Sequence, residues 1–377
     1  MPIKGQGRHC DILSRISESF QPFIKEILKE LNFGLCRSKV DFEKLRNSTN
    51  SKTALADQFT IILPYAGHYL RWEVLFDATC PWYAPDFRFD DENFLANVDS
   101  ACIEKHVPSL AKWNDDDPKA LSNVIQELIA LYREHQKTLL GEDENSRAYF
   151  EYTTLIGDSN TQEHDVEIFV GRGDSVNFMI KLNIDYSQLP ALFSDDCNIH
   201  ENPGGECAVL LIKYPNPSNA ELIMSPLINR AVGDITLPPI HQTAVLMDYV
   251  PMVTNLINKK IKMIFDNERH RQEMLSRFIV KYEGGILEHD SNSASFLLEV
   301  NDFYCILQIE IGLNFPEKPP MLSLRSVYHS HKRRPCVKPL SLCPYDRIQE
   351  YISQQVEIFK AECSDAVVAI PPDNVLI

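Results

Sequence analysis

Two stretches of the sequence share one pattern: residues 80–89 read CPWYAPDFRF, and residues 315–324 read FPEKPPMLSL. In each stretch, two prolines four positions apart lead directly into a short run rich in apolar residues. Proline fixes φ and has no amide N–H to donate, so such a pair ends the preceding strand and holds a rigid, extended connection. A mere loop would not be expected to recur after similar strands. The pattern therefore predicts two copies of one structural unit.

A strand meander is expected before each of these turns. Apolar and polar side chains alternate between residues 58 and 89, with a turn at residues 65–68, and they alternate again over residues 303–313. A period of two is typical of antiparallel strands with one buried face. Residues 13–31 instead repeat apolar side chains every three or four positions, which predicts an amphipathic helix. A helix-then-meander unit thus occurs near both ends of the chain.

Two more helical segments flank the middle of the chain. Residues 121–132 have a helical period, and Asp117-Pro118 before them supplies a cap and a first-turn proline. Residues 252–282 are helical in period almost throughout, but Asp266-Asn267 interrupts the apolar register and offers a second cap. The sequence therefore predicts two consecutive helices there.

The middle segment predicts a third, degenerate copy of the unit. After a polar linker at residues 141–146, three apolar runs alternate with turn residues, and a turn with two prolines follows at residues 213–217. We expect an α+β fold of tandem domains, each an antiparallel meander packed with helices. The expected domains cover residues 10–140, 146–265 and 266–371; the three apolar runs are 166–170, 178–185 and 208–214.

Composition narrows the functional classes. The chain has 53 acidic and 37 basic residues, a net charge of −16, which disfavours binding to a phosphate backbone. Charges interrupt every long apolar stretch well before the roughly 20 residues that span a bilayer, and the first residues lack an apolar signal segment. The ten cysteines form no closely spaced pairs, which favours a reducing compartment. We therefore expect an ordered protein without direct nucleic-acid or membrane partners.

The repeated turn resembles that of the ubiquitin-conjugating-enzyme fold and its inactive UEV and RWD variants, in which an aromatic-Pro-x-x-x-Pro turn follows the third strand. Over nearly its full length the chain also resembles the BRE family of deubiquitinase-complex subunits. The stretches that carry this second resemblance are 62–67 (ILPYAG), 70–72 (LRW), 85–87 (PDF), 150–152 (FEY), 248–251 (DYVP) and 326–329 (SVYH).

The resemblance implies a non-catalytic scaffold with three protein partners. BRE-like subunits belong to the BRISC complex and to its nuclear counterpart in the DNA-damage response. They bridge a zinc metalloprotease that cleaves lysine-63-linked ubiquitin, together with an Abraxas-type scaffold, to a von Willebrand-A-like adaptor. Inactive variants of the fold bind ubiquitin or short proline-containing peptides beside such turns, which adds ubiquitin to the expected partners. The implied location is both cytoplasmic and nuclear.

Catalysis by this chain has little support in the sequence. A conjugating enzyme needs a reactive cysteine and an oxyanion-stabilising asparagine, and the His-Pro-Asn segment that supplies the asparagine in active relatives is absent. Cys102, eleven residues before Trp113 and four before His106, is the one candidate in the first unit, and its apolar flanks favour a packing role. Cys336 and Cys343 stand in the third unit, also without that segment. The alternative function is a degenerate conjugating enzyme or chain-building cofactor that uses Cys102 or a partner's cysteine.

Partner binding is the more credible activity, and the two turns are its expected location. Trp82 and Tyr83 could anchor a partner because large rings bury much area at low entropic cost, or they could fill the groove between turn and helix. The histidines and cysteines lack paired metal-ligand spacings, and no phosphate-binding glycine loop is present, so we expect neither metal nor cofactor. The expected partner-binding residues are Trp82, Tyr83, Pro85, Phe315, Pro316 and Pro319.

Overall fold

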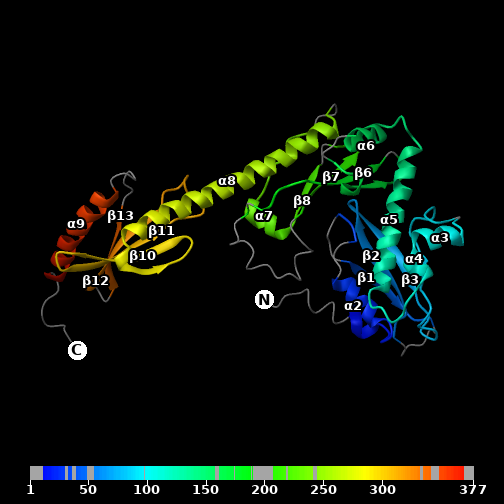
Figure 1. The fold of residues 1–377 in the computed structure, drawn as a ribbon, viewed down its shortest axis with the longest axis horizontal. Coiled ribbons are helices and arrows are strands. Elements are labelled where there is room, and N and C mark those ends of the chain that lie inside the picture. The colour runs from blue at the N-terminus through cyan, green and yellow to red at the C-terminus, as the bar shows by residue number, and fades with distance from the viewer. Residues whose placement is uncertain are drawn as a thin grey trace. The chain divides into compact units, whose positions relative to one another are not determined.

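The computed structural model describes residues 12–29, 33–35, 40–48, 55–96, 98–157, 161–173, 175–187, 189, 207–217, 220–240, 244–331, 334–340 and 348–368. The chain divides into two compact units: a first of residues 1–187 and 191–259, and a second of residues 188–190 and 260–377. Within the described residues, three antiparallel sheets form, two in the first unit and one in the second (Figure 1). The predicted α+β class is confirmed.

The first sheet is the expected meander. Its strands follow the order β1-β2-β3-β4. Tyr65 pairs with His68 across a tight turn in which Ala66 has φ 44° and Gly67 has φ 71°. Two positive φ values match the right-handed twist of the flanking strands. The bounds are β1 (Asp41–Arg46), β2 (Gln58–Tyr65), β3 (His68–Leu75) and β4 (Asp86–Arg88).

Helices pack on this sheet to form the first core. Side chains from α2 (Gln21–Lys29), from β2 and β3, and from α5 (Ala120–Gly141) share one buried cluster. The short helices α3 (Ser100–His106) and α4 (Pro108–Ala111) lie against α5. The core thus forms where the alternating strand residues and the helical stripe predict it.

The single helix expected over residues 13–31 is wrong in extent. A short helical turn at residues 12–15 is followed by an extended step, and α2 begins only at Gln21. At that step the backbone pairs with Ala56, whose carbonyl accepts from the Ser17 amide at 2.9 Å. Pro22 has no amide hydrogen, so it fits the first turn of a helix and not its interior.

The second helix begins slightly later than predicted, at Ala120. The predicted cap, Asp117, is wrong: Lys119 is the N-cap residue and makes no side-chain capping bond. Asp117 instead closes the turn before the helix, where its carboxylate accepts from the Lys119 amide at 3.0 Å and its carbonyl accepts from the Ala120 amide at 2.9 Å. Pro118 therefore lies just before the helix and not at its first position.

The second sheet confirms three strands predicted for the middle segment, with β6 ending earlier than residue 185. Strand β7 is buried on both faces, consistent with its continuous apolar sequence. Helix α6, which the sequence did not lead us to expect, follows residues 141–146 directly. The elements are α6 (Arg147–Gly157), η1 (Glu163–Asp165), β5 (Val166–Val170), β6 (Val176–Lys181), β7 (Ala208–Tyr214), β8 (Glu221–Met224) and α7 (Pro226–Val232).

A buried carboxylate joins the first two sheets. Glu167 of β5 is fully buried and accepts from the Arg133 guanidinium at 2.6 Å and from the backbone amides of Leu35 at 2.8 Å and Ala66 at 3.3 Å. An acid in such a position needs this full set of donors, because an unpaired buried charge costs several kcal/mol. Glu167 therefore ties the β2–β3 turn and α5 to the second sheet.

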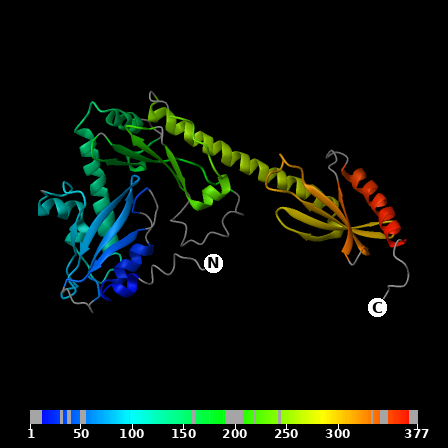
Figure 2. The same ribbon diagram turned by 180° about the vertical axis from the view of Figure 1, so that it is seen from behind.

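The second unit holds the remaining sheet, in the order β13-β12-β11-β10-β9. The inward residues of the strands share one core with α9 and with the C-terminal half of α8 (Leu246–Lys281), so both helices pack on the same face. Figures 1 and 2 show this sheet from its two sides, with α9 against β12. The elements are η3 (Glu283–Gly285), β9 (Ile286–His289), β10 (Ser293–Val300), β11 (Phe303–Glu310), β12 (Met321–His331), β13 (Arg334–Leu340) and α9 (Ile348–Val368).

The two helices expected over residues 252–282 are one. Helix α8 runs without interruption from Leu246 to Lys281, with Pro251 near its start. The Asp266-Asn267 pair does not cap a new helix, because Asp266 pairs within the helix with Arg269 at 3.6 Å. The boundary between the two compact units falls inside α8, after Lys259.

The division into three domains at residues 10–140, 146–265 and 266–371 stays a prediction. Among the helices described, none is long and apolar enough to cross a lipid bilayer.

Candidate functional site

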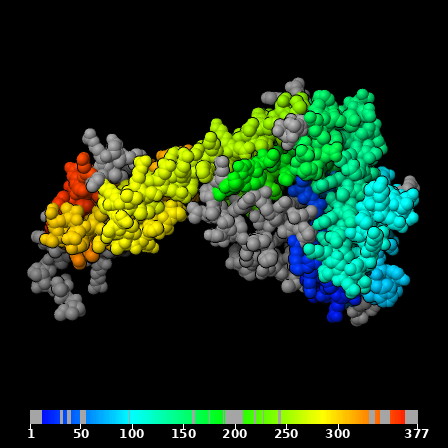
Figure 3. Space-filling model, viewed as in Figure 1, coloured from blue at the N-terminus to red at the C-terminus, as the bar shows by residue number. Residues whose placement is uncertain are grey.

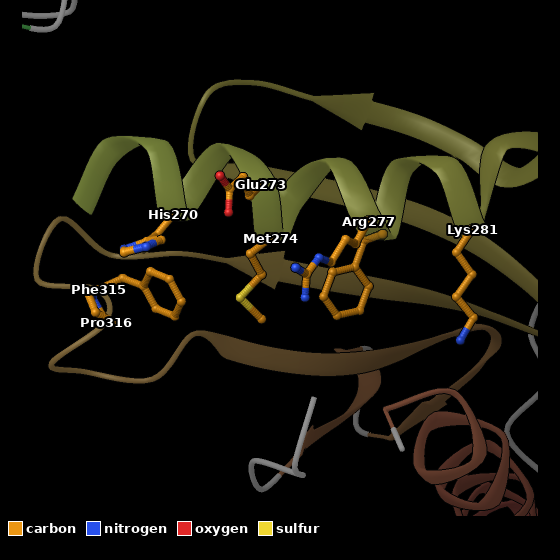
Figure 4. A pocket seen from close by; sticks show the side chains of 8 residues that line it. His270, Glu273, Met274, Arg277, Lys281, Phe315 and Pro316 are labelled. Carbon is orange, nitrogen blue, oxygen red and sulfur yellow. The ribbon is translucent and has the colours of Figure 1, made fainter. Parts of the chain in front are cut away.

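The second unit contains a groove between α8 and the proline turn at residues 315–320. It has a volume of 340 Å³, within the range of about 300–1,000 Å³ usual for ligand sites. Figure 4 shows side chains from the helix and from the turn pointing into the same space. Its lining residues are His270, Glu273, Met274, Arg277, Phe278, Lys281, Phe315 and Pro316.

The helical wall of the groove follows from the period of α8. The six lining residues from His270 to Lys281 follow the spacing i, i+3, i+4, i+7, i+8 and i+11, which places them on one stripe of the helix. Met274 and Phe278 are also buried in the core of the unit, so they form a fixed apolar floor. Figure 3 shows this part of α8, in yellow-green, at the surface of the unit.

The opposite wall is the turn that the sequence singled out. Phe315 is buried, whereas Pro316 and Pro319 are exposed. The turn is closed by its own backbone, since the Phe315 amide donates to Gly312 at 3.1 Å and the Lys318 amide donates to Asn314 at 2.9 Å. Two of the six expected binding residues, Phe315 and Pro316, thus line the groove, and Pro319 is not a lining residue.

A buried ion pair holds the two walls together. The Arg271 guanidinium pairs with Glu268 one turn earlier in α8, and it also donates to the Leu313 carbonyl at 2.8 Å. Gln272 donates to the other carboxylate oxygen of Glu268 at 3.0 Å. Both charged side chains are almost fully buried. Arg271 therefore positions the turn beside α8, and its role was not apparent from its sequence context.

The groove has a basic rim. Its one acidic residue, Glu273, lies 3.7 Å from the guanidinium of Arg269, which is not a lining residue. Lys281 extends over the ring of Tyr282, 5.1 Å from its centroid, and partial burial lowers the pKa of this lysine. Burial also raises the pKa of Tyr282, to about 12. Arg277 and Lys281 thus remain as cations beside an apolar floor.

The other expected binding residues belong to the turn of the first unit. Trp82 is 55% exposed and Tyr83 is 66% exposed, so the structure places both rings at the surface and not between turn and helix. Pro85 is buried and presents little surface to a partner. Asp77 and Asp57 support this turn, accepting from the Thr79 amide at 2.8 Å and from the Ala78 amide at 3.1 Å.

Cys102 lies outside the core on α3, half-buried, so the predicted packing role describes it poorly. Its sulfur is 3.3 Å from Nδ1 of His106, one turn along the helix, and its amide donates to the capping Asp99 at 2.8 Å. Cys336 is half-buried as well, and Cys343 lies outside the described residues. The described part of the chain contains no group of three His, Cys, Asp or Glu side chains placed to hold a metal ion.

Comparison with known proteins gives consistent matches over most of the chain. The sequence profile of the family described as Brain and reproductive organ-expressed protein (BRE) matches residues 14–330. A Branchiostoma floridae protein named "BRISC and BRCA1-A complex member 2" is 33% identical over 341 residues, which cover 85% of this chain and 86% of the relative. A Danio rerio protein of the same name is 28% identical over 337 residues, covering 84% of each chain.

Proposed function

The chain belongs to the BRE family, and from that premise we propose that it is a non-catalytic scaffold subunit of a deubiquitinase complex. Its two relatives are named as members of the BRISC and BRCA1-A complexes. In the proposed role the chain bridges a zinc metalloprotease specific for lysine-63-linked ubiquitin, with its Abraxas-type partner, to a von Willebrand-A-like adaptor. Ubiquitin itself is a further proposed contact.

One observation carries the proposal: the groove between α8 and the 315–320 turn has the features of a surface that holds a segment and lacks those of a reaction centre. Its floor is apolar, and its walls are fixed by a structural ion pair between Arg271 and Glu268. The lining residues include no nucleophile beside a general base, which hydrolysis or acyl transfer would need. Such a surface supports an assembly role, in which a subunit is recognised through exposed apolar and charged side chains.

The proposed partners suggest a direct experiment. The tagged chain is purified from cell extract, and both the eluate and the isolated recombinant chain are assayed for cleavage of lysine-63-linked diubiquitin. We expect cleavage only in the eluate, and loss of that cleavage when zinc is chelated. Cleavage by the isolated chain would contradict a non-catalytic role, and an eluate without isopeptidase activity would contradict membership of such a complex.

A second function, in ubiquitin conjugation, is favoured by one contact. The Cys102 sulfur and His106 Nδ1 lie 3.3 Å apart, and the same nitrogen lies 3.0 Å from the Cys102 carbonyl oxygen. A carbonyl oxygen only accepts, so Nδ1 carries a hydrogen in this geometry and is placed to donate to a Cys102 thiolate, the nucleophilic form of the side chain. If Cys102 accepts ubiquitin, charging with activating enzyme and ATP should give an adduct that thiol reductant removes and that Cys102→Ser abolishes. Under the scaffold proposal no such adduct forms.

A further inference from the structure

The charges around the second-unit groove are not balanced. Glu273 is the one acidic residue of the lining, and the Arg269 guanidinium outside the groove lies near both Glu273, at 3.7 Å, and Asp266, at 3.6 Å. The Arg277 and Lys281 side chains have no carboxylate partner among the residues that the structure describes. In a chain with 53 acidic and 37 basic residues, two unpaired cations beside one apolar floor form a locally positive surface.

The dimensions of the groove fit an extended peptide segment. From His270 to Lys281 the helical wall is about 16 Å long, at 1.5 Å per residue. An extended chain of about five residues covers that length, at roughly 3.3 Å per residue. Met274, Phe278 and Phe315 belong to the buried core and form the floor. In Figure 4, Arg277 and Lys281 lie toward the end of the groove away from Phe315.

We propose that this groove binds an extended segment of a partner protein in which a large apolar side chain stands next to acidic residues. The apolar side chain packs on Met274, Phe278 and Phe315, and the neighbouring carboxylates pair with Arg277 and Lys281. The proposal deepens the scaffold function by naming the chemistry of one partner contact. It rests on that function for the identity of the complex, whereas the binding itself can be measured on the chain alone.

Other occupants fit the groove less well. A basic segment would place like charges against Arg277 and Lys281, which opposes association. A nucleic acid needs many clustered cations and would leave the apolar floor uncovered. A buried apolar contact with a charged rim is instead the usual composition of a protein contact, in which the anchor supplies affinity and the rim charges supply orientation.

The test uses the purified full chain and two pools of short fluorescein-labelled peptides. In one pool a central Leu or Phe is flanked by Asp and Glu; in the other, Lys and Arg replace the acids. Binding is followed by fluorescence anisotropy. We expect the acidic pool to bind more tightly, and its affinity to fall as salt is added, because rim charges are screened.

A groove variant and a matched control test the contribution of the two cations. Arg277→Glu with Lys281→Glu should weaken the acidic pool by about tenfold and improve binding of the basic pool, as expected when two rim charges are reversed. Lys262→Glu, an exposed lysine of α8 outside the groove, is the matched control and should leave both affinities near those of the native chain. A circular dichroism spectrum of each variant confirms that it is folded.

Three outcomes would overturn the proposal. These are equal binding of the two pools, no binding of either, or a loss in Lys262→Glu as large as in the groove variant. Concentration-dependent dimerisation that Arg277→Glu removes would assign the groove to a second copy of the chain. A failed peptide assay beside a successful co-purification of isopeptidase would leave the scaffold function intact and reject only the groove.

Discussion

The two units contain the same connection between neighbouring strands and use it differently. Residues 76–85 join β3 to β4, and residues 311–320 join β11 to β12, with equal length between the paired strand ends. The last residues of these connections, Pro85 and Pro320, are both buried. The length and the position of the connection are therefore shared, although the peptide bond before Pro316 is cis and the bond before Pro81 is not. The side chains around the two connections differ as well.

Aromatic rings fill the space between helix and turn in the first unit. Phe76 stacks on Phe20 at 4.2 Å and on Phe23 at 5.9 Å, and Trp113 lies 5.3 Å from Phe23. The three tryptophans of the chain are residues 72, 82 and 113, so the second unit has no counterpart of Trp113. In the second unit, the space between the helix and the turn is the groove.

The two turns also expose different kinds of side chain. Trp82 and Tyr83 point outward in the first unit, whereas Glu317 and Lys318 occupy the equivalent positions in the second. The first unit therefore offers exposed rings outside a filled interior, and the second offers an apolar groove beside a charged turn. A repeated backbone can thus present two unlike contact surfaces, because a few side-chain volumes decide which space is occupied.

Removing the central ring should have the largest effect. Phe76 is buried and touches the rings of four other aromatic residues, which lie just before α2, on α2, on β2 and in the loop before α5: Phe20, Phe23, Phe59 and Trp113. Phe76→Ala should destabilise the first unit by about 3–5 kcal/mol through lost burial and a residual cavity. Chemical denaturation followed by tryptophan fluorescence measures this. Trp82→Ala is the control and should change stability by less than about 0.5 kcal/mol; similar losses in both variants would contradict the filled-interior description.

Breaking the buried Arg271–Glu268 ion pair of the second unit should have the second-largest effect on stability. Arg271→Ala leaves Glu268 buried with only Gln272 as donor and releases the Leu313 carbonyl. We expect a loss of about 2–4 kcal/mol and faster hydrogen exchange over residues 311–320.

The matched control for this prediction is Arg269→Ala. The Arg269 side chain is 54% exposed, against 4% for Arg271, and its exposed ion pairs contribute less than about 1 kcal/mol. If the two variants are equally stable, the buried pair does not hold the turn.

A smaller effect should follow from crowding the β2–β3 turn against the second sheet. A Cβ at Gly67 would lie 2.7 Å from the side chain of Leu211, at a φ of 71°. Gly67→Ala should therefore cost about 2–3 kcal/mol, from the left-handed backbone and the clash together. Gly173→Ala has a φ of 68° but open space around it, so it should cost only about 1 kcal/mol. If the two variants lower the thermal midpoint equally, the contact with Leu211 contributes nothing to stability.

Periodicity predicted much of this fold because buried faces repeat along strands. Most of the alternating residues predicted over 303–313 are buried as expected: Phe303, Cys305, Leu307, Ile309 and Ile311. Leu313 is the exception, because it lies beyond the end of β11 and is exposed. The proline turns were also found where expected. Helix boundaries were harder to predict. Asp266-Asn267 lies inside the continuous α8, where Asp266 pairs with Arg269 of the same helix. Over residues 13–31, backbone pairing with Ala56 interrupts the expected helix.

The groove itself could be predicted only in part. The sequence located Phe315 and Pro316 through the repeated turn, but the six residues of α8 that complete the lining carry no motif. Whether a space is empty depends on side chains that are distant in sequence, as the presence of Trp113 in one unit and its absence from the other illustrate. Arg271 was missed for the same reason, since its partner carbonyl belongs to Leu313.

A last and smallest effect is expected from pH at the junction of the first two sheets. His68 stacks on Phe169 with the rings 4.1 Å apart, and burial lowers its pKa below the ordinary value of 6.5, although Asp90 opposes this shift. As the pH falls through 6.5, the unfolded chain therefore takes up a proton that the folded chain does not, and stability is lost. Above pH 6.5 the stabilising contribution of the neutral His68 side chain is fully present. His68→Phe keeps the stacked ring and removes the titration, so its thermal midpoint should fall less steeply with acidification than that of the native chain. Parallel slopes for the two proteins would show that His68 does not contribute to the pH dependence.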